Sequence, residues 1–153
     1  MGLEVGDIVP DFIAKNDLGE DFNSKEWIGH KPIVIYFYPK NFTPGCIKEA
    51  CDFRDSYADF IELGVEVIGV SSDSINSHKR FKDRYKLPFP FLSDSNGALK
   101  KIFGIKTTLL GILPGRETFV IDQEGIVRLK FNSMNASRHL QKAISTVKKL
   151  MHS

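Results

Sequence analysis

Residues 36–51 have the sequence YFYPKNFTPGCIKEAC, and the fold of the chain is organised around this stretch. An apolar, aromatic run enters a turn that contains Pro39, Pro44 and Gly45. The turn opens a predicted helix, because proline is favoured at the first helical position. Cys46 lies in the first turn of that helix, and Cys51, the only other cysteine, follows five residues later. The stretch predicts a strand–turn–helix junction that presents a thiol.

A cysteine in the first turn of a helix is favoured as a thiolate. Unpaired backbone N–H groups and the helix dipole stabilise an anion there. Thr43 can offer its hydroxyl to the sulfur or to an oxygen beside it. Pro39, Pro44 and Gly45 can shape the turn so that backbone donors approach a small oxyanion. We therefore predict that Cys46 is a nucleophile.

The second cysteine is out of reach of the first while the helix is intact. Residues five apart on a helix differ by about 140° of rotation and about 7.5 Å of rise. This separation exceeds the ~7 Å limit between the Cα atoms of a disulfide. We expect a Cys46–Cys51 disulfide only if the first turns of the helix unwind, so the pair would be a switch. The alternative for Cys51 is a small buried hydrophobic residue.

The rest of the chain alternates strands and helices. Apolar runs and turn residues predict strands at residues 11–15, 20–23, 32–38, 65–71, 89–92, 117–122 and 126–131. Helical spacing and capping residues predict one helical turn at 24–27 and helices at 44–63, 74–87, 96–103 and 135–150. Either Asp73 or Ser74 can cap the third of these, and either Asn135 or Ser137 can begin the last. Residues 107–115 are expected to form an irregular loop.

This order predicts the fold class. Parallel crossovers followed by a terminal hairpin and helix fit an α/β protein with a central mixed β-sheet flanked by helices. The arrangement is thioredoxin-like, with an N-terminal β-hairpin extension. Residues 32–38 have no polar alternation and are expected in the sheet centre. Residues 89–92 are expected near an edge, because Pro90 lacks a ladder donor. We predict a single domain over residues 1–153.

Composition excludes several classes of function. The 153 residues include 21 basic and 19 acidic side chains, a net charge of +2, which is too balanced for a nucleic-acid-binding protein. The longest apolar runs are shorter than a membrane-spanning helix, and the N-terminus lacks the apolar core of a signal peptide. Two cysteines are too few for a secreted disulfide framework. We therefore expect a soluble protein of the reducing cytoplasm, with no membrane or nucleic-acid partner.

Metal binding is not indicated by the sequence. The histidines at positions 30, 78, 139 and 152 are scattered, and a metal site would need further ligands of suitable spacing. We interpret these histidines as surface groups. The carboxylate of Glu49 is either a solvated helix charge or a partner that holds a cation near Cys46.

The pattern Pro39-x-x-x-Thr43-x-x-Cys46 resembles the active-site loop of the peroxiredoxin family. The longer segment at residues 42–55, FTPGCIKEACDFRD, is similar to the Q-type subgroup, also called bacterioferritin comigratory protein. The resemblance continues in GVSSD at 69–73, in LPFPFLSD at 87–94 and in RETFVID at 116–122, so it spans most of the chain.

This resemblance implies roles for individual residues. Cys46 would be the peroxidatic cysteine and Cys51 the resolving one. Thr43 would hydrogen-bond the peroxide and the thiolate, and Arg116 would stabilise the thiolate and the developing negative charge. The remaining positions shape the pocket: Pro39 would shield it, and Glu49 would position an arginine.

The function implied is a thiol-dependent peroxidase that reduces hydrogen peroxide and organic hydroperoxides. Cys46 would be oxidised to a sulfenic acid and then form an intramolecular disulfide with Cys51. Thioredoxin is the expected reductant, with glutaredoxin as a second possibility. The resemblance also implies a monomer that uses no metal, haem or flavin cofactor.

Other classes of function use the same cysteines. A redox sensor could signal to a partner through the oxidised, unwound helix. A thioredoxin-type disulfide reductase would share the fold, but it would need a C-x-x-C pair at the helix start, where position 43 is Thr43. A purely structural domain leaves Thr43, Cys46 and Arg116 unexplained.

Overall fold

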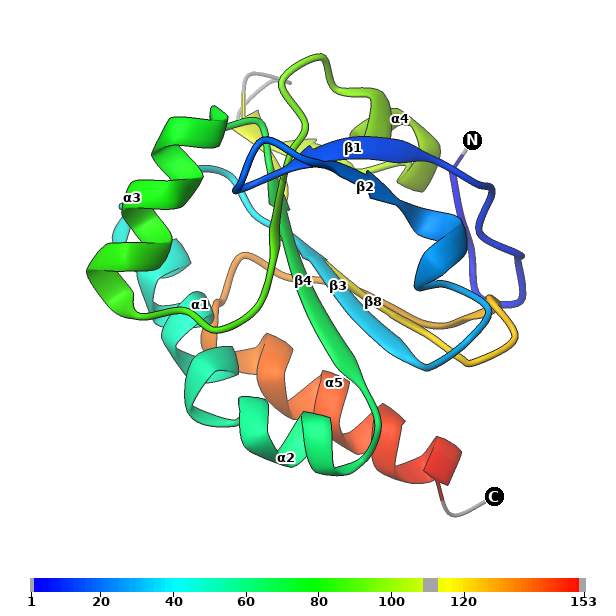
Figure 1. The fold of residues 1–153 in the computed structure, drawn as a ribbon. Coiled ribbons are helices and arrows are strands. Elements are labelled where there is room, and N and C mark those ends of the chain that lie inside the picture. The colour runs from blue at the N-terminus through cyan, green and yellow to red at the C-terminus, as the bar shows by residue number, and fades with distance from the viewer. Residues whose placement is uncertain (1, 109–112, 152–153) are drawn as a thin grey trace.

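The computed structural model describes residues 2–108 and 113–151, with a seven-stranded mixed sheet at its centre. The strand order is β2-β1-β5-β4-β3-β8-β9. Helices α1, α2, α3 and α5 lie on one side of the sheet, and α4 with the N-terminal segment lies on the other (Figure 1). This arrangement confirms the predicted α/β, thioredoxin-like fold with helices on both faces of the sheet.

The central strand is β3 (Ile33–Phe37), and all of its side chains are buried. It pairs in parallel with β4 (Glu66–Ser71) and antiparallel with β8 (Glu117–Ile121). Successive side chains of a strand point to opposite faces, so Val34 and Tyr36 join one core cluster and Ile33 and Ile35 join the other. The continuous apolar run therefore forms the interior strand that it predicted.

The helix that follows the cysteine turn is shorter than predicted. The sequence predicted one helix over residues 44–63, but the structure has α1 (Pro44–Asp55) and α2 (Tyr57–Glu62). Ser56 separates them, with φ −105° and ψ 3°, which is outside the helical region. Phe53 of α1 and Phe60 of α2 are both fully buried. Gly64, at φ +76°, ends α2 as predicted.

The prediction that residues 89–92 lie near an edge of the sheet is wrong. Strand β5 (Phe91–Ser93) pairs with β4 on one side and with β1 on the other. Pro90 precedes the strand, and its carbonyl oxygen accepts a hydrogen bond from Gly69 N. Because an acceptor is all that the ladder needs at that point, the missing N–H of proline does not exclude an interior position.

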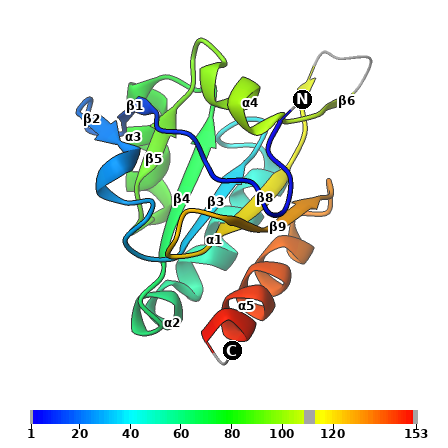
Figure 2. The same cartoon turned by 90° about the vertical axis from the view of Figure 1, so that its right-hand side faces the viewer.

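The N-terminal hairpin forms as expected from strands β1 (Ile13–Asn16) and β2 (Asp21–Asn23). The short 3₁₀ helix η1 (Ser24–Glu26) follows, but its cap is Asn23, whose side chain accepts from Lys25 N. The predicted cap, Ser24, is buried and accepts from Phe12 N instead. The segment before β1 passes beside β8 and β9 (Figure 2), and Ile8 forms an antiparallel bridge with Ile126.

The remaining elements frame this core. Helix α3 (Ile75–Tyr85) is capped by Ser74, one of the two predicted candidates, and α4 (Ala98–Phe103) ends at Gly104. The predicted irregular loop contains two short paired strands, β6 (Thr107–Thr108) and β7 (Leu113–Pro114), while residues 109–112 lie outside the described residues. Strand β9 (Val127–Asn132) forms the predicted hairpin with β8, and Gly125 in the turn has φ +85°.

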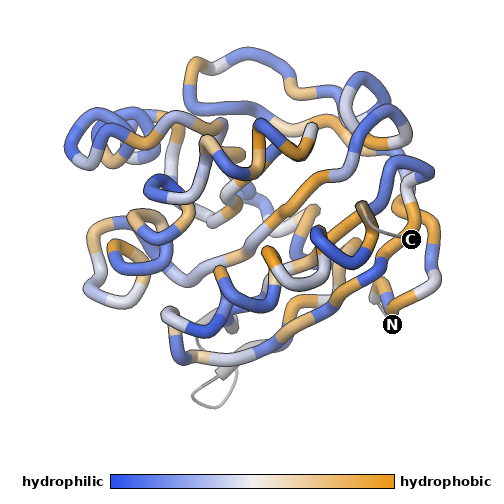
Figure 3. The backbone as a smooth tube through the Cα atoms, turned by 90° about the horizontal axis from the view of Figure 1, so that it is seen from below, coloured by the Kyte–Doolittle hydropathy of each residue, from blue (hydrophilic) through white to orange (hydrophobic). Residues whose placement is uncertain are grey.

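The last helix, α5 (Ser137–Met151), packs against α1 and β8. Figure 3 shows apolar and polar residues alternating along the helices, as expected for helices with one buried face. The fully buried positions of α5 are His139, Ala143 and Val147. Of the stripe that the sequence predicted, Leu140, Ile144 and Leu150 are only partly buried. The buried stripe is therefore rotated, and it contains a histidine.

Candidate active site

Cys46 occupies the third position of α1. Thr43 is the N-cap residue, with an extended backbone, and Pro44 is the first helical residue. The first intrahelical bond runs from Ile47 N to Thr43 O. Cys46 therefore lies where backbone N–H groups are not used by the helix. Its side chain is 1% exposed, and the cysteine is a free thiol.

Arg116, which immediately precedes β8, brings a positive charge to this thiol. Its Nη2 lies 3.5 Å from Cys46 Sγ, and its Nη1 lies 2.6 Å from Glu49 Oε1. Glu49 follows Cys46 by three residues, so both side chains lie on the same face of α1. All three side chains are buried. The structure thus brings together Cys46, Arg116 and Glu49, and Glu49 is the cation-holding partner and not a solvated charge.

Gly45 allows this close approach. A Cβ atom added at position 45 would lie 2.8 Å from Arg116 Nη2, a distance below that of real Cβ contacts. A side chain there would collide with the guanidinium. The need for glycine comes from this contact, and it gives a physical basis for the predicted pocket-shaping role.

The other predicted residues lie in the turn itself. Thr43 Oγ1 donates its proton to Lys40 O over 2.8 Å. That proton cannot at the same time bond the sulfur, so the predicted thiolate contact of Thr43 is not formed in this structure. The oxygen keeps lone pairs that can accept a proton from a bound hydroperoxide. Pro39 is half-buried and Pro44 is exposed.

A buried polar network holds the turn in place. Asn41 N donates to Asp73 Oδ2 over 2.8 Å, and Tyr38 Oη donates to Asn41 Oδ1 over 2.5 Å. The Asn41 amide nitrogen lies 3.0 Å from His78 Nδ1. The next residue, Phe42, adopts φ +66°, an unusual backbone conformation for a bulky side chain. The network keeps this conformation, and with it the start of α1, in one arrangement.

Cys51 lies one turn and a half farther along α1 and is a half-buried free thiol. Because α1 is helical from Pro44 to Asp55, the two cysteines are separated as the sequence predicted for an intact helix. The structure therefore does not bring Cys46 and Cys51 together.

Burial shapes the ionisation of the groups around the thiol. Burial raises the pKa of Glu49 to about 8, against the opposing influence of Arg116. Burial alone would lower the pKa of Arg116, but the negative charges of Glu49 and Cys46 raise it. Burial also raises the pKa of Tyr36 well above its ordinary value. Arg116 is therefore the positive charge of the site, and Tyr36 is neutral.

Two histidines that the sequence analysis placed on the surface are fully buried. His78 lies in the network that holds the turn. His139 packs behind Glu49, with its Nδ1 3.5 Å from Glu49 Oε2. Only His30 is exposed as expected, and His152 lies outside the described residues. The spacing of four between positions 139, 143 and 147 is the signal that could have placed His139 on the buried face.

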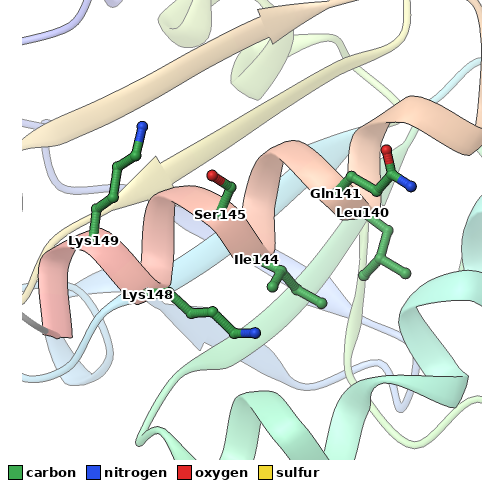
Figure 4. A pocket seen from close by; sticks show the side chains of 6 residues that line it. All are labelled: Leu140, Gln141, Ile144, Ser145, Lys148 and Lys149. Carbon is green, nitrogen blue, oxygen red and sulfur yellow. The ribbon is translucent and has the colours of Figure 1, made fainter.

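A surface pocket along α5 is lined by Leu140, Gln141, Ile144, Ser145, Lys148 and Lys149 (Figure 4), none of which is a predicted site residue. Within residues 2–108 and 113–151, His, Cys, Asp and Glu side chains form no group of three that could hold a metal ion. In the same residues, no helix has the length and apolar character to cross a membrane.

Comparison with known proteins identifies the family of this chain. The AhpC/TSA family profile matches residues 5–130. The chain belongs to the AhpC/TSA family. It is 43% identical over 146 residues to peroxiredoxin Q, chloroplastic, of Suaeda salsa, covering 95% of this chain and 68% of that protein.

Solved structures of similar proteins extend the comparison. Peroxidoxin BcpB from Mycobacterium tuberculosis has a TM-score of 0.88 at 35% identity, over 96% of this chain and 97% of that one. The bacterioferritin comigratory protein of Xanthomonas campestris, whose alkyl peroxide reduction activity has been studied structurally, has a TM-score of 0.86 at 31% identity, over 97% and 98% of the two chains. The resemblance to Q-type peroxiredoxins is confirmed, and the protein is a thiol peroxidase.

Proposed function

We propose that Cys46 is the residue that attacks the hydroperoxide and that Cys51 resolves the product. The observation that carries this proposal is the Arg116 guanidinium, 3.5 Å from the Cys46 sulfur and fixed by Glu49. A preorganised cation at this point stabilises a thiolate, and also the negative charge that spreads over sulfur and two oxygens in the transition state.

The first step forms an S–O bond and breaks the O–O bond. The Cys46 thiolate attacks the terminal peroxide oxygen, and the leaving oxygen takes a proton and departs as water or an alcohol. Cys46 becomes a sulfenic acid. Thr43 accepts the peroxide proton in a hydrogen bond, and Pro39, Pro44 and Gly45 shape the turn that surrounds the reacting oxygen. Hydrogen peroxide and organic hydroperoxides are the proposed substrates.

The second step requires α1 to unwind. A sulfenic acid is neutral, so oxidation removes the negative charge that Arg116 attracts on Cys46. The helix loses part of its attachment to the sheet at that moment. Cys51 then reaches the Cys46 sulfur, an S–S bond forms, and the sulfenic oxygen leaves as water. The disulfide is exchanged with an external dithiol, for which we propose thioredoxin, with glutaredoxin as the second candidate.

We further propose that the protein acts as a monomer, forms a single domain and works in the cytoplasm. The two cysteines, which are too few for a secreted disulfide framework, support a reducing compartment. An intramolecular disulfide supports a monomeric catalytic unit, because both cysteines come from one helix.

The test compares two single-cysteine variants with the wild type. Cys46→Ser is expected to abolish peroxide consumption. Cys51→Ser is expected to complete one oxidation of Cys46 but to lose recycling by thioredoxin or glutaredoxin, each supplied with its own reducing system. Lys48→Ala, an exposed change on the same helix, serves as the control. Full turnover by Cys46→Ser would contradict the role of Cys46, and normal recycling of Cys51→Ser would contradict that of Cys51.

A further inference from the structure

His139 closes the back of the active site. It comes from α5 and is fully buried, with Nε2 2.7 Å from Ser133 O and Nδ1 2.7 Å from Thr118 Oγ1. A carbonyl oxygen can only accept, so Nε2 carries a hydrogen. Ser133 N in turn donates to Arg116 O. The backbone of Ser133 therefore bonds both His139, through its carbonyl oxygen, and Arg116, through its N–H.

The contact between His139 Nδ1 and Glu49 Oε2 contains no hydrogen when Glu49 is a carboxylate and neutral His139 carries its hydrogen on Nε2. Glu49 Oε1 accepts from Arg116, but Glu49 Oε2 is buried and has no hydrogen-bond partner among the described residues. It lies 3.5 Å from His139 Nδ1. A carboxylate oxygen and a neutral imidazole nitrogen are both acceptors, so they do not attract each other. A proton on Nδ1 can be shared between Glu49 Oε2 and Thr118 Oγ1 and makes an ion pair, while a proton on Oε2 can bond Nδ1 once the Thr118 hydroxyl turns its own hydrogen away.

The charges around the pair also favour an added proton. With Cys46 as a thiolate, Glu49 as a carboxylate and His139 neutral, Arg116 faces two negative groups, and the buried set has an excess negative charge. One proton on Glu49 or His139 makes the set neutral, which burial favours. The titratable, charged or hydrogen-bonding groups that face the pair are Cys46 and Asp52 of α1, Tyr36 of β3, Arg116 before β8, Thr118 of β8, Ser133 after β9 and Arg138 of α5.

We propose that Glu49 and His139 share one proton, and that this proton leaves the charge of Arg116 available to the Cys46 thiolate. This inference rests on the proposed function of Cys46 and adds a positioning residue to it. When the proton is present, Glu49 does not neutralise Arg116. When it is lost, Glu49 becomes a full anion, competes with the thiolate for Arg116, and slows the attack on peroxide.

The ionisation of the two groups agrees with one shared proton. Burial raises the pKa of Glu49 to about 8 and lowers the pKa of His139 to about 4. Between these values the pair holds a single proton, and it loses that proton as the pH rises through about 8. The rate of Cys46 oxidation should therefore fall as the pH rises through about 8. We call this fall the alkaline limb of the pH profile. Thiolate formation alone would instead make the rate rise with pH.

The first test is kinetic. The rate of Cys46 oxidation by hydrogen peroxide is measured against pH in single turnovers of Cys51→Ser, with the product detected by intact-protein mass spectrometry. Adding His139→Gln is expected to move the alkaline limb towards neutral pH by about one unit, because glutamine can donate to the Glu49 carboxylate but cannot take its proton. His30→Gln, at the exposed histidine whose ring bonds only Lys25 O, is the control and should leave the limb in place.

The proposal would be overturned by a pH profile without an alkaline limb, by a limb that stays in place in His139→Gln, or by a limb that moves equally in His30→Gln. A general loss of rate at every pH, without movement of the limb, would also overturn it, because that result indicates a purely structural role.

The second test does not use peroxide. Heteronuclear NMR of the wild type near pH 6, midway between the two pKa values, should show either a protonated Glu49 carboxyl or a His139 imidazolium. An ionised Glu49 beside a neutral His139 would overturn the shared proton even if the peroxidase proposal holds. Conversely, a Cys46 that is never oxidised at any pH would contradict the proposed function, and NMR would still decide the proton.

Discussion

Replacing Gly45 with alanine is a sharp test of how Arg116 is held against Cys46. The added methyl group would lie 2.8 Å from Arg116 Nη2. The guanidinium is buried and bound to Glu49 at 2.6 Å, so it cannot simply move into solvent. The substitution therefore acts on the position of the charge and leaves the cysteine unchanged.

The size of the effect follows from this distance. An ordinary contact begins at 3.4 Å, so the guanidinium must move by about 0.6 Å, the difference between 3.4 and 2.8 Å. A displacement of about 1 Å at a reacting centre can cost about 100-fold in rate. We expect Cys46 oxidation to slow by roughly 10- to 100-fold. Meanwhile, alanine is the better helix former by up to about 1 kcal/mol, so the folded protein should not be destabilised to the same extent.

The assay is single-turnover oxidation by hydrogen peroxide in the Cys51→Ser background, with the unfolding free energy measured in parallel. Lys48→Ala, on the exposed face of α1, is the control for a change to alanine that does not touch Arg116. An oxidation rate within twofold of the parent protein would refute the reasoning. So would a slow variant that has also lost most of its stability, because the loss of rate would then have a different cause.

Three further predictions follow from the same contacts. Arg116→Lys should slow Cys46 oxidation by about 100-fold in stopped flow, because one ammonium cannot hold both the thiolate and Glu49; a normal rate would contradict the two-contact role. In urea unfolding, the wild type should lose stability as the pH rises from about 4.5, where unfolded glutamate releases its proton, through about 8, where folded Glu49 does, and up to about 2 kcal/mol of this loss falls above about pH 6.5. Glu49→Gln should show no such fall, and equal slopes would exclude Glu49 as the source. One equivalent of peroxide should remove amide-exchange protection from α1 in the wild type but not in Cys51→Ser; a disulfide formed with α1 still protected would contradict unwinding.

Much of the fold could be predicted because local signals agree with tertiary packing. The uninterrupted apolar run of β3 requires burial on both faces, and the paired turn residues fix the hairpins. The misplacement of residues 89–92 has a physical cause, which is that the deciding partner is distant in sequence. The missing N–H of Pro90 led to the prediction of an edge strand. The hydrogen bond formed there needs only the carbonyl oxygen of Pro90, which accepts from Gly69 N. The helix over residues 44–63 showed continuous spacing, and no local signal marked the break at Ser56.

The candidate site was predicted unevenly. Helix-start chemistry indicated Cys46 directly from the sequence. Arg116 is seventy residues away, so its role came only from the family resemblance, and its contact with Gly45 could not be seen at all. His139 was missed because scattered histidines are usually exposed, and its place on the buried stripe of α5 depends on how that helix rotates against β8.

The break at Ser56 limits how much structure the catalytic cycle has to dismantle. Helix melting is cooperative, and in a single helix from residue 44 to 62 the strain of bringing two thiols together would propagate along its length. Here α1 ends at Asp55 and α2 begins at Tyr57, and α2 has its own contacts with β4. Melting of α1 would therefore end at Ser56 and leave α2 docked. The same boundary would provide a folded end from which α1 can rewind once the disulfide is reduced.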